Sequence, residues 1–264
     1  MSKLLNYINA TILLVFAGGV SAMPVPIDLN AFVQEGQASS GNWVVAGDGN
    51  SVLQTINGLP TAFVSPNNFF NTQFQGSFGA ANDGDNDWMG FVFGFDADDT
   101  TPFYLLDWKQ GQQSGSAPGF TLAEVSGGLS SIPFSNHNVD AANYDVLATN
   151  LGTGWVDNLI YDFTLEYTET LIKVDVSGGT FGTGQTIFNL ATTGNTTGRF
   201  GFYNNSQSQV TYQGFTQTVA PTFCELNPTD PQCVPGTSVP IPAPFSLLAA
   251  GLIVLGLSRK RAKV

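Results

Sequence analysis

The chain has few basic residues. Among its 264 residues are 8 Lys and Arg against 20 Asp and Glu, a net charge of −12. Between residues 23 and 238 only Lys109, Lys173 and Arg199 are basic, against all 20 acids, so this part carries −17. Nucleic-acid binding depends on Lys and Arg contacts to phosphate groups. The composition therefore excludes nucleic acid as a partner and favours divalent cations or simple solubility.

Histidine is nearly absent too. His137 is the only one, and it lies in the polar stretch Ser-Asn-His-Asn, so a Ser-His-Asp triad would have one possible base. The chain lacks a Gly-x-Ser-x-Gly elbow and a His-rich zinc pattern. It also lacks the Glu-x-Asp-x-x-Glu strand signature that places the two carboxylates of sandwich-type retaining glycosidases. We therefore predict that the protein is not an enzyme.

Cysteine occurs twice, at Cys224 and Cys233. In an exported protein, an even pair at short spacing indicates a disulfide, whereas a metal or redox role needs more ligands or a Cys-x-x-Cys spacing. We predict that Cys224 and Cys233 form a disulfide. It would close a small loop within a Pro-rich linker over residues 221–238.

The first 22 residues have the pattern of a secretory signal peptide. Lys3 gives a positive charge, an apolar run follows over residues 10–20, and small residues precede Met23. The run is shorter than the ~20 apolar residues that span a bilayer. A buried N-terminal helix is the alternative, but Pro24 and Pro26 follow at once. We predict export, with cleavage by signal peptidase before Met23.

The C-terminal residues 239–264 form a tail in three parts. A Pro-rich motif comes first, an apolar stretch second and a basic cluster last; the motif residues are Val239, Pro240, Pro242, Ala243 and Pro244, and the cluster is Arg259, Lys260 and Arg261. Residues 241–258 would form a helix of about 27 Å, enough to span a bilayer once, with the basic cluster in the cytoplasm. An ordinary membrane anchor and a sorting signal both fit this pattern.

This tail resembles the PEP-CTERM sorting signal of Gram-negative bacteria that secrete exopolysaccharide. Ile241 stands where the commonest form of that signal has Glu. The resemblance implies processing by an exosortase-type enzyme, with the membrane as a partner until the tail is cut. We therefore expect the protein on the cell-envelope surface or outside the cell.

The remaining residues, 23–220, have the pattern of one all-β domain. The chain has 30 Gly, and short apolar or β-branched runs alternate with Gly, Asn, Asp and Pro. Phe91, Phe93 and Phe95 have a spacing of two, which predicts one shared face in the core. A dozen short strands predict an antiparallel sandwich; we expect them over residues 43–45, 52–56, 61–64, 72–78, 89–95, 103–108, 120–125, 159–168, 170–176, 185–190, 198–203 and 209–215.

The middle of the chain resembles the thrombospondin C-terminal domain. The most specific segments are residues 86–95 (Asn-Asp-Trp-Met-Gly-Phe-Val-Phe-Gly-Phe) and 103–110 (Phe-Tyr-Leu-Leu-Asp-Trp-Lys-Gln). Residues 42–57 and 198–215 are similar to the first and last strands of that family, so the resemblance covers residues 42–215. It implies a concanavalin A-like jelly roll, calcium binding and cell adhesion. The calcium-binding repeats that precede the domain in animal thrombospondins are missing, as is Arg-Gly-Asp.

One acidic loop is the candidate metal site. Asp83, Asp85 and Asp87 alternate with Gly84 and Asn86, so several oxygens could face one Ca²⁺ ion, which takes 6–8 oxygen ligands. The loop is not an EF-hand, because Trp88 stands where that motif needs Gly. The resemblance implies calcium here, with Asp87 foremost; a solvated acidic turn is the alternative.

Two tryptophans next to loops, Trp88 and Trp155, are candidates for stacking on sugars, whereas Trp43 and Trp108 fit the core. We therefore expect a calcium-binding, adhesive surface or matrix protein whose partner is a matrix protein or an exopolysaccharide. A lectin-like protein that holds exopolysaccharide is the alternative.

Overall fold

The computed structural model describes residues 22–69, 71–96, 101–192 and 198–219. Residues 22–220 make up one compact unit, and we describe this unit by itself. The predicted signal peptide, the cysteine pair and the sorting tail lie outside the described residues. Within the described ranges, no helix has the length and apolar character needed to cross a membrane.

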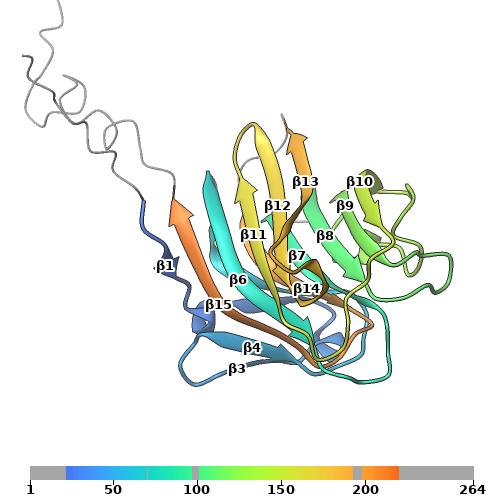
Figure 1. Ribbon diagram of the computed structural model, residues 1–264, viewed down its shortest axis with the longest axis horizontal. Helices are drawn as coiled ribbons and strands as arrows, with labels where there is room; N and C mark the ends of the chain where they lie inside the picture. The colour runs from blue at the N-terminus through green and yellow to red at the C-terminus, as the bar shows by residue number, and fades with distance from the viewer. Residues whose placement is uncertain (1–21, 70, 97–100, 193–197, 220–264) are drawn as a thin grey trace, which may run out of the picture. The chain divides into compact units, whose positions relative to one another are not determined.

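The unit consists of two antiparallel sheets, and the predicted all-β sandwich is confirmed (Figure 1). One sheet has the order β13 (Gln185–Ala191), β12 (Leu171–Gly178), β11 (Tyr161–Tyr167), β6 (Thr72–Ala80), β15 (Val210–Val219), β4 (Ser51–Gln54) and β3 (Trp43–Val45), and β1 (Val25–Pro26) pairs with β15. The other has the order β10 (Tyr144–Leu151), β9 (Gly119–Val125), β8 (Phe103–Lys109), β7 (Trp88–Phe95), β14 (Arg199–Asn205), β5 (Thr61–Asn68) and β2 (Val33–Gly36).

Four short 3₁₀ helices lie in the connections, at Leu29–Ala31 (η1), Ala38–Ser40 (η2), Leu129–Ser131 (η3) and Gly179–Phe181 (η4). Each of the twelve predicted strands overlaps an observed one. Three observed strands, β1, β2 and β10, were not predicted from the sequence. All three lie at or beside a sheet edge, where side chains are largely exposed and the apolar pattern is weak.

Aromatic rings fill the space between the sheets. Phe91 of β7 stacks on Phe163 of β11 with ring centroids 3.8 Å apart, and Phe74 of β6 stacks on Phe200 of β14 at 4.0 Å. Trp108 of β8 is fully buried in this cluster, as predicted. Aromatic side chains bury large areas, so these contacts between the sheets carry much of the stability of the unit.

The predicted common face of Phe91, Phe93 and Phe95 is wrong for its last member. Phe91 and Phe93 lie between the sheets, whereas Phe95 lies in a second apolar cluster on the other face of β7. The cause is a β-bulge: the register with β14 shifts, and Gly94 adopts φ +64°. Such an extra residue turns the next side chain to the opposite face, and Gly tolerates the positive φ.

The second cluster exists because both faces of β7 and β8 are covered. Every residue of these two strands is buried. Residues 126–143, the β9–β10 connection, supply Leu129 and Ile132, which join Val92 and Leu105 on the face turned away from the first sheet. Antiparallel sheets commonly leave one face to solvent, so this covered face is a distinct feature of the fold.

Candidate functional site

The predicted metal loop, residues 81–87, connects β6 to β7 and packs against the β14–β15 turn. Asp83 Oδ2 accepts hydrogen bonds from Ser208 Oγ (2.6 Å), Gln207 Nε2 (3.0 Å) and the Ser208 amide (3.2 Å). Burial raises the pKa of the Asp83 carboxyl, but these bonds and one from the Asp85 amide outweigh it, so the net shift is downward. Asp83 therefore fixes the loop to the neighbouring turn.

Asp85 lies at the solvent side of the loop. Its carboxylate accepts hydrogen bonds from the Asn57 side chain and from the Asn86 amide, the latter at 2.8 Å. Burial and the nearby charge of Asp87 raise the pKa of the Asp85 carboxyl above its ordinary value, although the Asn86 amide opposes this. Two neighbouring carboxylates that repel each other in this way favour a cation between them.

Asp87 has a different partner. It is buried, and its Oδ1 lies 2.8 Å from the Lys109 ammonium, which is 1% exposed. Lys109 Nζ also donates to Asn86 O (3.0 Å), Asn86 Oδ1 (3.2 Å) and Gln113 Oε1 (3.0 Å), and it lies 4.0 Å from the centre of the Trp88 ring. The Lys109 ammonium is thus surrounded by oxygen atoms, and one of them belongs to Asp87, the residue predicted from the sequence to be the foremost calcium ligand.

The three aspartates do not converge on one point. Asp83 faces Ser208, Asp85 faces Asn57, and Asp87 faces Lys109. Across the described residues, no group of three or more His, Cys, Asp or Glu side chains is arranged to hold a metal ion. Calcium binding therefore stays a prediction. Among the three aspartates, Asp85 and Asp87 are the two whose carboxylates interact with each other, so they are the pair that could share a cation.

The predicted sugar platform of Trp88 and Trp155 is wrong. Trp88 is 3% exposed, and one of its faces stacks on the His137 ring at a centroid distance of 4.1 Å. Trp155 is 1% exposed, and its Nε1 donates to the Asp87 carbonyl at 3.3 Å. Proximity to a loop in the sequence does not distinguish an exposed ring from one that anchors the loop, and here both rings are anchors.

His137 is also buried, although its sequence neighbours are polar. Its Nδ1 lies 2.6 Å from Asp107 Oδ2, and its Nε2 lies 2.7 Å from the Pro133 carbonyl. Because a carbonyl only accepts, Nε2 carries a proton and donates it. Burial raises the pKa of the Asp107 carboxyl, and the nearby His137 and Lys109 oppose that shift. The pair fastens the β9–β10 connection to β8.

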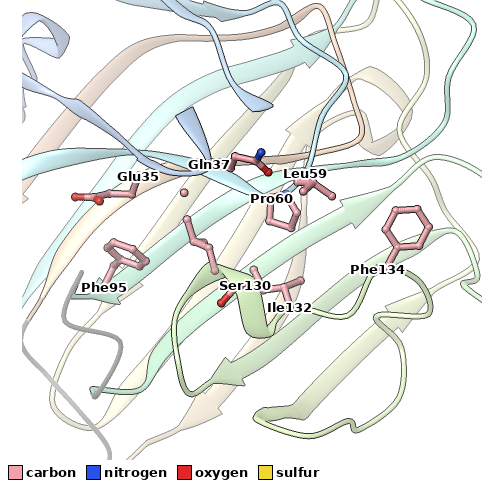
Figure 2. A pocket seen from close by; sticks show the side chains of 10 residues that line it. Glu35, Gln37, Leu59, Pro60, Phe95, Ser130, Ile132 and Phe134 are labelled. Carbon is pink, nitrogen blue, oxygen red and sulfur yellow. The ribbon is translucent and has the colours of Figure 1, made fainter. Parts of the chain in front are cut away.

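A pocket that sequence reasoning missed lies between the edge strand β2 and the β9–β10 connection (Figure 2). Its volume is about 580 Å³, and its lining includes Glu35, Gln37, Pro60, Ser130 and Phe134. Figure 2 shows Glu35 and Phe95 toward one end and Phe134 toward the other. The one signal in the sequence was Phe134, an aromatic residue between Pro133 and Ser135 in the long connection after residues 120–125.

The fold places the described unit in the class of all-β sandwiches with two antiparallel sheets. Three solved structures are similar to this unit. A carbohydrate-binding module from Bacillus subtilis aligns with TM-score 0.50 and 12% identity over 71% of this chain and 95% of its own. The metal-free exoplasmic/lumenal domain of VIP36 aligns with TM-score 0.50 and 10% identity over 73% and 86%. A B. subtilis protein of unknown function with a galectin-like fold aligns with TM-score 0.50 and 13% identity over 76% and 96%. At these identities the likeness shows the fold alone.

Sequence comparison relates one segment of the chain to a particular family. Residues 38–132 match the model of the family described as the thrombospondin C-terminal region. Thrombospondin-4 of Bos taurus is 37% identical over 73 residues, and cartilage oligomeric matrix protein of Homo sapiens is likewise 37% identical over 73 residues. These alignments cover 28% of this chain but only 7% and 9% of the two relatives.

The family match supports the resemblance in its N-terminal part. It includes the acidic loop and the strands from β3 to β9. Residues 198–215, which also resemble the family, lie outside the matched segment.

Proposed function

We propose that this protein is an exported, non-enzymatic surface or matrix module that acts in adhesion. The observation that carries the proposal is the match of residues 38–132 to the thrombospondin C-terminal region. A cartilage matrix protein is also among the relatives, 37% identical over 73 residues. The buried pairs add support: the His137 ring and the Lys109 ammonium each have a carboxylate partner inside the protein and do not face solvent. Neither group is placed to act on an external substrate.

Calcium binding is part of this proposal, at the acidic loop. Asp85 and Asp87 would supply carboxylate oxygens, while Asp83 holds the loop in shape through Ser208. With two carboxylates and the rest of the ligands from water or backbone, the site would resemble weak extracellular calcium sites, with Kd on the order of 10⁻⁴–10⁻³ M.

A melting experiment tests the calcium site. We expect millimolar Ca²⁺ to raise the melting temperature of the full chain relative to EDTA, because a ligand that binds only the folded state stabilises it. Asp85→Asn should abolish the shift. Asp145→Asn removes an exposed carboxylate of β10 and should leave the shift intact. Equal melting temperatures in Ca²⁺ and EDTA for the unchanged protein would contradict the proposal.

The partner in adhesion would be a matrix protein or the exopolysaccharide of the same cell. Adsorption of the purified chain to isolated matrix, with and without Ca²⁺, tests the adhesive role. Retention that matches that of an unrelated acidic protein of similar size would argue against it.

The ends of the chain add the route of export. We propose removal of residues 1–22 by signal peptidase, sorting through the tail by an exosortase-type enzyme of a Gram-negative bacterium, and a Cys224–Cys233 disulfide in the linker. Cell fractionation with mass spectrometry of both mature ends tests this. An intact C-terminus reaching Val264 in surface material would contradict processing, and a free thiol at Cys224 would contradict the disulfide.

A further inference from the structure

We propose that the pocket between β2 and the β9–β10 connection binds a neutral sugar unit of a polysaccharide, with Phe134 as the stacking ring. This inference deepens the polysaccharide form of the proposed adhesive role and rests on it. It also moves the sugar contact away from the tryptophans that the sequence offered, which are buried.

The pocket has the size and the mixed lining of a small-ligand site. Its volume of about 580 Å³ lies within the range of roughly 300–1,000 Å³ that ligand pockets occupy. Leu129 and Ile132 form part of its wall and are anchored in the second apolar cluster. At the rim, the Phe134 side chain is 76% exposed, and Leu59 is 47% exposed. Together, these two side chains give the rim of the pocket an exposed apolar surface that a ligand could contact.

The side chains around the ring have the chemistry that a sugar needs. A pyranose presents apolar C–H groups on one face and hydroxyls at its edge. Phe134 offers an apolar ring face, while Gln37 and Ser130 offer an amide and a hydroxyl in the same pocket. Amide and hydroxyl groups both donate and accept, which matches sugar hydroxyls.

Charge indicates that the sugar is neutral. Arg199 is the one basic residue that the structure places beside the described pocket lining, and it is engaged: Nη1 lies 2.9 Å from Glu35 Oε1, and the guanidinium lies 5.2 Å from the centre of the Phe95 ring. The chain as a whole carries −12. An acidic polysaccharide would therefore meet repulsion without a cation to bind it.

The ring sits on a firmly held segment. Pro133, immediately before Phe134, accepts a hydrogen bond of 2.7 Å from the buried His137, and His137 is paired with Asp107. Ser131 Oγ donates to the Gly127 carbonyl at 2.9 Å on the other side. Such preorganisation lowers the entropic cost of binding.

Affinity electrophoresis of the full chain tests the inference, with gels that contain dextran, laminarin or galactomannan as neutral probes and polygalacturonate as an acidic one. We expect at least one neutral glycan to retard the protein and polygalacturonate to have no effect. Phe134→Ala should weaken the affinity measured from the retardation about tenfold or more, because this ring is the proposed stacking contact. Phe134→Trp should keep it, and Leu147→Ala, an exposed apolar residue of β10 outside the pocket, should not change it.

The outcomes separate this inference from the proposed function. No retardation by any neutral glycan, retardation by polygalacturonate, or unchanged retardation in Phe134→Ala would overturn the sugar site. Capture of apolar peptides through Phe134 in place of glycans would overturn it as well. Adsorption to matrix and the calcium shift are measured on the same variants, so their persistence without glycan binding would leave adhesion standing while the sugar site fails. If the unchanged protein does not adsorb to the isolated matrix, the proposed function itself is contradicted.

Discussion

The buried pair of His137 and Asp107 provides the sharpest test of how this fold is held together. Asp107 is 1% exposed, His137 is fully buried, and the two are joined at 2.6 Å. His137→Phe keeps a ring that can stack on Trp88 but leaves the Asp107 carboxylate without its partner. Removing one partner of a buried pair costs about 3–5 kcal/mol. Since domains have about 5–15 kcal/mol in total, this loss is large.

The double variant separates the pair from its surroundings. Asp107→Leu alone leaves a buried imidazole nitrogen unpaired, at a cost of about 1–3 kcal/mol. In His137→Phe/Asp107→Leu both polar groups are gone, and an apolar replacement of a buried ion pair is often close to neutral. We therefore expect the double variant to be more stable than the sum of the single changes predicts, by at least about 2 kcal/mol.

Urea unfolding followed by tryptophan fluorescence measures these free energies, and equal m-values would show that the unfolded state is unchanged. The reasoning is refuted if His137→Phe costs less than about 1 kcal/mol, or if the two changes add within about 0.5 kcal/mol.

The pH dependence of His137→Phe gives a second readout. Burial raises the pKa of Asp107, so the folded state favours the protonated carboxyl. The contribution of a group with a raised pKa is complete below its unfolded value, about 3.9, and is lost as the pH rises through the folded value. His137 opposes this rise, so the pKa of Asp107 should be higher still in His137→Phe. Between pH 4 and pH 7 the variant should lose stability relative to the unchanged protein over the interval that separates the two folded-state pKa values, by up to about 1.4 kcal/mol per pH unit. A constant difference across this range would contradict the assignment.

Three further predictions concern other parts of the unit. Lys109→Met leaves the buried Asp87 unpaired and should cost about 3–5 kcal/mol in urea unfolding. Lys173→Met, at the partly exposed pair with Asp175, should cost less than about 1 kcal/mol, and equal costs would contradict the role of Lys109. Gly90→Ala should cost about 3 kcal/mol or more, because a Cβ atom there would lie 2.0 Å from the Leu106 carbonyl oxygen. Gly84→Ala, at φ +78° with no neighbouring atom in the way, should cost only about 1–2 kcal/mol. Urea unfolding measures both losses, and similar values at the two sites would contradict this prediction. Ser208→Ala removes the 2.6 Å hydrogen bond to Asp83, whose pKa is lowered in the folded protein. The variant should lose about 1 kcal/mol of stability at pH 7, and the loss should shrink as the pH falls below about 3.8. A loss that grows toward low pH would contradict this prediction.

The strands could be read from the sequence because their signal is local. Alternating apolar residues and intervening Gly, Asn and Pro located twelve strands, each of which overlaps an observed one. The edge strands β2 and β10 escaped because exposed side chains need no apolar pattern. The face of Phe95 was missed because a bulge at Gly94 depends on pairing with β14, far along the chain.

The candidate site was harder to predict, because the role of each aspartate depends on a partner that lies far away in the sequence. Asp83, Asp85 and Asp87 look alike in the sequence. The fold gives them three different partners, Ser208, Asn57 and Lys109, and so three different roles. His137 looked solvated and is buried.

The sequence by itself determined the all-β class, the acidic charge, the resemblance to the thrombospondin C-terminal region and the expectation of export, since composition, short-range pattern and motif order carry these. Only the tertiary structure decided which polar groups are buried, which rings are exposed and where a pocket opens. The physical reason is that burial and pairing depend on residues brought together across sheets. The β9–β10 connection covers β7 and β8, encloses Trp88 and His137, and leaves Phe134 as the ring that faces solvent.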